Sequence, residues 1–90
     1  MTKVVIYSSS LCGLEMRSQT TSLQSLVFAL TKETPPVVLI DKDADARKFV
    51  FSKTDIRGVF PLLFVDDAFV GTYDDVRDMH DAGELVKLLQ

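Results

Sequence analysis

The chain has 90 residues, of which 47% are hydrophobic, so it has the length of one domain and enough apolar side chains for a core. Its 13 acidic and 10 basic residues give a net charge of −3, and the basic residues are scattered along the chain. We therefore expect one domain over residues 1–90 that binds neither nucleic acid nor a membrane.

Cysteine content and the first residues bear on the compartment. Cys12 is the only cysteine, so no disulfide can form within the chain, which is typical of reducing compartments. The apolar run at residues 4–7 is too short for a secretory signal or a membrane span. We therefore expect a cytoplasmic protein.

The first half of the chain predicts a strand, a long helix and a second strand. The β-branched and aromatic run at residues 4–7 indicates a strand that is buried on both faces. Apolar residues at spacings of three and four predict an amphipathic helix over residues 14–31, with its first turns partly exposed. Pro35 and Pro36 cannot continue a helix, and residues 37–40 predict the second strand.

A second helix and a hairpin follow. Asp43 is suited to cap the helix, because its carboxylate can accept a bond from a free amide of the first turn. The apolar residues on one face of this helix are Ala46, Phe49 and Val50. Residues 62–65 and 68–70 then predict two strands, joined by the tight turn Asp66-Asp67.

The last part of the chain predicts a third helix and one further helical turn. Asp74 or Asp75 is expected to cap the helix, with Val76 and Met79 facing inward. Gly83 is expected to separate it from the last turn, whose apolar residues are Leu85, Leu88 and Leu89.

This order of elements predicts an α/β fold. Two strands joined by a helical crossover pair in parallel, and the later hairpin adds antiparallel strands to the same sheet. The expected architecture is a four-stranded mixed sheet with helices on both faces.

The order resembles the thioredoxin fold of glutaredoxins over essentially the whole chain, and three local patterns match that family. Residues 5–12 resemble the glutaredoxin strand and loop that end in the nucleophilic cysteine. Residues 56–61 resemble the segment that carries the cis-proline. Residues 71–75 resemble the turn and acidic helix start where glutaredoxins hold the γ-glutamyl end of glutathione.

Shorter pieces are similar to one group of glutaredoxin relatives, the SH3-binding glutamic-acid-rich-like proteins, which mostly lack the redox cysteines. These pieces are residues 7–10, 17–19 and 71–74. The resemblance implies a groove lined by Ser10, Leu11, Cys12, Phe60, Pro61, Gly71, Thr72, Tyr73, Asp74 and Asp75.

Three departures from the glutaredoxin pattern weaken the redox site. Glu15 stands where the resolving cysteine would be, so dithiol chemistry within one molecule is impossible. Ser9 replaces the lysine that pairs with a carboxylate of glutathione. Asp74 replaces a small hydroxyl residue and would repel the ligand's own carboxylate.

Several of these residues have two interpretations. Cys12 lies where a loop enters a helix, a place that can lower the pKa of a thiol, or it is an unreactive cysteine at an ancestral position. Pro61 is either the cis-proline or an ordinary proline at the start of a strand. Asp74 and Asp75 are helix caps or ligand contacts, and Tyr73 is a groove wall or a half-buried residue at a strand end.

The remaining polar residues predict no metal site. His80 is the only histidine and is expected at the surface. Asp41, Asp43 and Asp45 lack the glycine and glutamate of a calcium loop, so we interpret them as strand-end and helix-cap residues. The polar run at residues 17–21 is either a contact surface or an ordinary solvated helix face, and the second interpretation is favoured.

The sequence favours a non-catalytic, monomeric protein-interaction module that uses the degenerate groove and requires no cofactor. The alternative is a monothiol glutaredoxin in which Cys12 exchanges with glutathione mixed disulfides, with weak glutathione binding and an iron–sulfur cluster less favoured still. A third hypothesis is redox sensing, in which oxidation of Cys12 modulates partner binding.

Overall fold

The computed structural model describes residues 3–10, 13–55 and 60–89. Its elements are β1 (Val4–Ser8), α1 (Leu14–Thr31), β2 (Val37–Leu39), α2 (Ala44–Lys53), β3 (Leu62–Val65), β4 (Ala68–Thr72), α3 (Tyr73–Asp81) and α4 (Leu85–Leu89). Every strand and helix expected from the sequence is present, and the ends differ by two residues at most.

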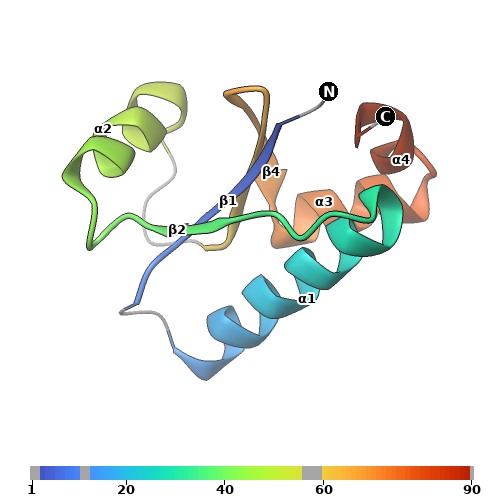
Figure 1. Ribbon diagram of the computed structural model, residues 1–90, viewed down its shortest axis with the longest axis horizontal. Helices are drawn as coiled ribbons and strands as arrows, with labels where there is room; N and C mark the ends of the chain where they lie inside the picture. Colours follow the sequence, from blue (N-terminus) through green and yellow to red (C-terminus); the bar gives the residue numbers. More distant parts are fainter. Residues whose placement is uncertain (1–2, 11–12, 56–59, 90) are drawn as a thin grey trace.

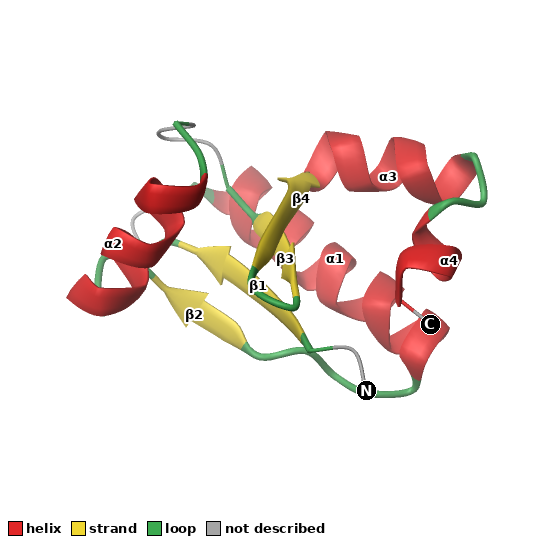
Figure 2. Ribbon diagram, turned by 90° about the horizontal axis from the view of Figure 1, so that it is seen from above, coloured by secondary structure: helices red, strands yellow, loops and turns green. Residues whose placement is uncertain are grey.

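The four strands form one mixed sheet in the order β2-β1-β3-β4 (Figure 1). β1 is parallel to β2 and antiparallel to β3, and β3 is antiparallel to β4. Helices α1, α3 and α4 cover one face of the sheet, and α2 covers the other (Figure 2). The predicted mixed sheet flanked by helices is confirmed.

The core has two halves, one on each face of the sheet. The half under α1, α3 and α4 contains Ile6, Leu23, Val27, Leu63, Val65, Val76, Leu85 and Leu89. The half under α2 contains Val5, Tyr7, Ile40, Val50, Leu62 and Phe64. The two central strands alternate between these halves, which explains why β3 is apolar at every position and β1 is apolar up to Ser8.

The turns and two of the helix ends follow their sequence signals. Asp43 caps α2, with its carboxylate accepting a bond of 3.0 Å from the Ala46 amide. Asp66 and Asp67 have φ values of 51° and 67°, as a tight hairpin turn requires. Gly83, with φ of 76°, separates α3 from α4.

Two expectations need correction. The residue that caps α3 is Thr72, because α3 already begins at Tyr73, and Asp75 therefore lies in its first turn. Thr20, expected on a solvated face of α1, is buried and contacts β1 through a hydroxyl pair with Ser8. In the described residues no helix is long and apolar enough to cross a membrane.

Candidate functional site

The end of the sheet brings together three of the segments expected to form a groove. Tyr7 of β1 pairs with Leu62 of β3, which pairs in turn with Thr72 of β4. The loop after β1, the residues before β3 and the start of α3 therefore meet at one edge. The Phe60–Pro61 peptide bond is cis, as the resemblance implied. Leu11 and Cys12 lie outside the described residues.

The junction of β4 and α3 is held by the carboxylate of Asp75. The amide and the hydroxyl of Thr72 each donate to Oδ2 of Asp75, both at 3.2 Å. Gly71 is buried beside them, and a Cβ at that position would lie 2.7 Å from the Cβ of Asp75. Glycine is thus required for the close approach, and Asp75 acts as the acidic partner of a capping arrangement.

Phe60 and Tyr73 pack on opposite faces of the sheet. Phe60 is half-buried against the core half under α2, whereas Tyr73 is half-buried against the half under α1 and α3. The guanidinium of Arg77, one helical turn later, lies 5.8 Å from the centre of the Tyr73 ring. Buried Pro61 and the Thr72 cap occupy the middle of this end of the sheet.

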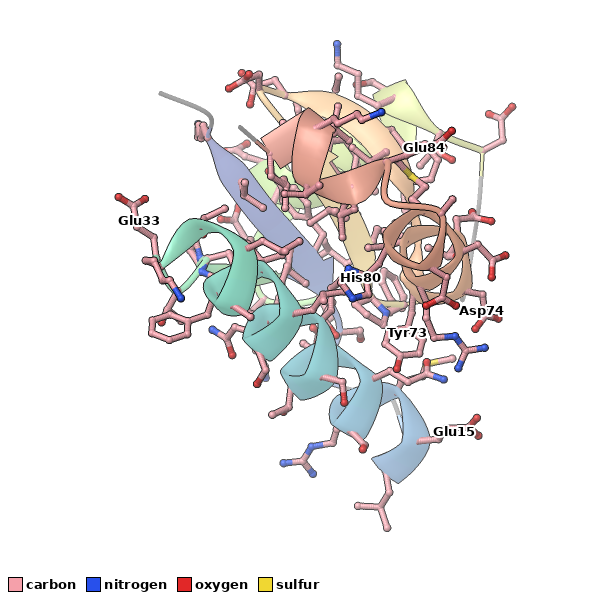
Figure 3. The ribbon with its side chains drawn as sticks, turned by 90° about the vertical axis from the view of Figure 1, so that its right-hand side faces the viewer. Glu15, Glu33, Tyr73, Asp74, His80 and Glu84 are labelled. Atoms are coloured by element: carbon pink, nitrogen blue, oxygen red, sulfur yellow. The ribbon has the colours of Figure 1, made fainter. Side chains whose placement is uncertain are left out.

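The start of α3 is acidic. Asp74 is exposed in the first turn, next to the Asp75 carboxylate that is bonded to Thr72. Glu15, exposed in the first turn of α1, extends toward the same side as Tyr73 and Asp74 in Figure 3. A ligand carboxylate that approached the amides of this helix start would therefore meet the protein's own carboxylates.

Ser10 is bound to Asp41, a contact that the sequence did not predict. The Ser10 amide donates to Oδ1 of Asp41 at 2.9 Å, and its hydroxyl donates to Oδ2. These two bonds lower the pKa of the Asp41 carboxyl below its ordinary value, because they favour the charged form. The loop after β1 is thereby fixed to the turn that follows β2.

A polar hollow of about 400 Å³ lies between α1 and β2, next to the end of β1. It is lined by Ser8, Ser9, Ser10, Arg17, Thr20, Thr21, Gln24, Val37 and Leu39. The Ser8 and Thr20 hydroxyls are 3.1 Å apart, and Thr20 donates to the Met16 carbonyl at 2.8 Å. Of the predicted site residues only Ser10 lines this hollow, so sequence reasoning missed it.

The described residues contain no cluster of three or more histidine, cysteine or acidic side chains placed to hold a metal ion. His80 is exposed on α3, as expected.

Comparison with known proteins identifies similar chains but no matching family model. The chain is 32% identical over 89 residues to a curated protein of Oryza sativa subsp. japonica, "Monothiol glutaredoxin-S6". The alignment covers 97% of this chain and 63% of that protein. The chain thus spans a little under two thirds of the length of this relative.

Solved structures share the whole fold. The C. albicans actin interacting protein Aip5 matches with a TM-score of 0.81 at 17% identity, over 98% of this chain and 88% of that one. A buckwheat glutaredoxin in complex with glutathione matches with a TM-score of 0.71 at 23% identity, over 98% and 76% of the two chains. This chain therefore has the glutaredoxin-like thioredoxin fold.

Proposed function

We propose that the protein is a non-catalytic interaction module of the cytoplasm, which uses the degenerate glutaredoxin groove to hold a segment of a partner protein. The observation that carries this proposal is the start of α3. There the Asp75 carboxylate already accepts the Thr72 amide, and Asp74 is exposed beside it. The position where glutaredoxins hold the γ-glutamyl carboxylate of glutathione is thus lined with negative charge, which repels that carboxylate.

The size of this repulsion supports the proposal. Two like charges ~4 Å apart repel by roughly 1 kcal/mol in water and about 4 kcal/mol near a protein surface. Since a factor of ten in affinity corresponds to about 1.4 kcal/mol, glutathione affinity should fall at least several-fold. Glu15 and Ser9, at the positions of the resolving cysteine and the ligand-pairing lysine, act in the same direction.

The fold itself is compatible with an interaction role. One structure of this fold is described as an actin interacting protein, which supports binding of a protein partner by such a domain. We further propose that the chain belongs with the SH3-binding glutamic-acid-rich-like proteins and acts as a monomer.

A titration with reduced glutathione tests the proposal. We expect no saturable backbone amide shifts in the wild type at ~10 mM glutathione, a concentration that would largely fill a millimolar site. Asp74→Ser should gain shifts at residues 72–75, because it removes one repelling carboxylate. Asp78→Ser, which removes an exposed carboxylate one turn later in α3, is the matched control and should gain none. Saturable binding by the wild type would contradict the proposal.

The second candidate is monothiol glutaredoxin chemistry at Cys12, favoured by the name of the rice relative. In the sequence Cys12 directly precedes Gly13, the N-cap residue of α1, and the resemblance to glutaredoxins places the nucleophile at this position. Measured deglutathionylation by the wild type that disappears in Cys12→Ser would support this candidate. Equal rates for the two proteins would exclude it and leave Cys12 as a site of redox modulation.

The partner-binding surface can be tested separately. Once a partner is captured, Phe60→Ala and Tyr73→Ala should weaken its binding, because both side chains border the end of the sheet. Phe28→Ala is the control, since Phe28 is 48% exposed on α1. Unchanged binding by both groove variants would show that the partner docks elsewhere.

A further inference from the structure

β2 is an outer strand of the sheet and has one unpaired edge. The sheet order places β1 on one side of it and no strand on the other. In Figure 2 it lies at the outside of the sheet, with α1 and α2 on the two faces rather than beyond its edge. The main-chain groups on the outer edge of β2 therefore have no neighbouring strand to pair with.

The register identifies these groups. Ile6 donates to the Pro36 carbonyl and Ile40 donates to the Ser8 carbonyl, both at 3.0 Å. With Ile6 opposite Val37 and Ser8 opposite Leu39, a parallel ladder turns the amide and carbonyl of Val38 toward β1. The main-chain groups of Val37 and Leu39 then point outward.

Three of these outward groups have no partner in the described part of the chain. The Leu39 carbonyl accepts the Lys42 amide at 3.0 Å, which ends the strand. The amide and carbonyl of Val37 and the amide of Leu39 remain. At the other end the edge stops at Pro36, because proline has no amide to donate.

The hollow between α1 and β2 places a positively charged side chain, Arg17, near this edge. Val37, Leu39 and Arg17 all line it, and Arg17 is the only charged side chain among its described lining residues. The Gln24 amide is fixed at the far end by its bond of 3.0 Å to the Pro35 carbonyl. Asp41, in the turn that follows β2, is already bonded to Ser10.

Arg17 lies toward the Leu39 end of the hollow. Leu39 pairs with Ser8, and the Ser8 hydroxyl contacts Thr20, which lies about one turn after Arg17 in α1. The Thr21 hydroxyl also donates to the Arg17 carbonyl at 3.2 Å. A negative charge that accepts the Leu39 amide would therefore lie at the cationic end.

We propose that this edge and hollow bind the carboxyl terminus of an extended peptide that runs parallel to β2. In a parallel ladder the Val37 amide donates to one peptide carbonyl, and the Val37 carbonyl accepts from the amide two residues later. The Leu39 amide then donates to the carboxyl group of that same residue. Where the peptide ends there, Arg17 neutralises its carboxylate.

The unpaired main-chain groups of β2 favour the carboxyl terminus of a peptide over a segment from the middle of a longer chain. A longer strand would need outward groups beyond Leu39, but the Leu39 carbonyl is used by the turn to Lys42. A peptide carboxyl terminus would use all of these groups. It would make two main-chain bonds with Val37 and one with Leu39, and its single negative charge would lie near the Arg17 guanidinium. This site is separate from the acidic start of α3.

The probe is acetyl-Val-Val-Ala with a free carboxylate, titrated into isotope-labelled protein under reducing conditions and compared with the same peptide as a C-terminal amide. We expect saturable shifts of the Arg17, Val37 and Leu39 amides, and affinity for the acid at least about tenfold above that for the amide. Arg17→Ala should remove this preference. Arg47→Ala, an exposed arginine on α2 at the other face of the sheet, should keep it.

Four results would overturn the proposal. Equal affinity for the acid and the amide would exclude carboxylate recognition. Acetate binding as tightly as the peptide acid would mean a simple anion site without strand pairing. Shifts confined to residues 71–75, or no saturable shifts up to ~10 mM, would exclude this edge as the binding site. Because β1 and β3 separate β2 from β4, which leads into α3, failure here leaves the glutathione test unaffected.

Discussion

The start of α3 and the edge of β2 both have main-chain amides near the surface. They differ in whether those amides are already bonded within the protein. At the start of α3 the Thr72 amide is bonded to the protein's own Asp75, with Asp74 exposed beside it. At the edge of β2 the Val37 and Leu39 amides have no partner in the described residues, and Arg17 lies in the adjoining hollow.

The difference lies in whether the protein's own side chains already use the main-chain donors. The acidic side chains at α3 satisfy the helix start, which stabilises the fold, and they repel an anion at the same position. In the described residues, no side chain of the protein accepts a bond from the outward amides of β2. We therefore expect anionic ligands to prefer the second region over the first.

The largest expected effect is a loss of stability at the start of α3, the first of the two regions. Gly71→Ala places a Cβ 2.7 Å from the Cβ of Asp75, and neither atom is the end of a flexible side chain. We expect the free energy of unfolding to fall by about 1–3 kcal/mol, as for other overpacked sites. Chemical denaturation measures the loss.

Gly13→Ala is the control for this substitution. No atom lies within 4 Å of a Cβ at Gly13, so the loss there should be clearly smaller. Equal losses at the two positions would mean that the close approach of β4 to α3 does not constrain Gly71.

A smaller effect is expected at the floor of the hollow. The Ser8 hydroxyl is buried and contacts Thr20 at 3.1 Å, so Thr20→Val leaves it without that partner. The expected loss in unfolding free energy is about 1–2 kcal/mol, because an unsatisfied buried polar group is costly. The double variant Ser8→Ala with Thr20→Val should recover part of it, and an additive loss would contradict a coupled pair.

The fold was predictable because its signals are local. The β-branched and aromatic run at residues 4–7 has the length and composition of a strand buried on both faces, and Asp43 caps α2 through the Ala46 amide, three residues away. The cis-proline was predictable only through the resemblance, since a proline at the start of a strand has the same local sequence.

The candidate sites were less predictable because they depend on contacts between distant segments. Ser10 and Asp41 are 31 residues apart, and no periodicity indicates that they meet. Thr20 has the polar neighbours of a solvated face, yet the end of β1 buries it. Thr72 caps α3 in place of the two aspartates that follow, because β4 extends to the first residue before the helix.

The smallest expected effect concerns the bond between the loop after β1 and the turn after β2, next to the second region. The Ser10 hydroxyl and amide hold the pKa of Asp41 below its ordinary value of 3.8, so Ser10→Ala should raise that pKa part of the way back. The amide bond persists in the variant, which is why the change is partial. Carboxyl carbon shifts, followed against pH, measure it, and Ser22→Ala on the exposed face of α1 should leave it unchanged.

The same bond predicts how stability depends on pH. A lowered pKa means that the folded protein favours the Asp41 carboxylate more than the unfolded chain does. This contribution is present above pH 3.8 and is lost as the pH falls through the folded value. The wild type should therefore be more stable than Ser10→Ala at neutral pH, and the gap should narrow in acid. A gap that is constant or widens as the pH falls would mean that the hydroxyl acts through packing and not through the charge of Asp41.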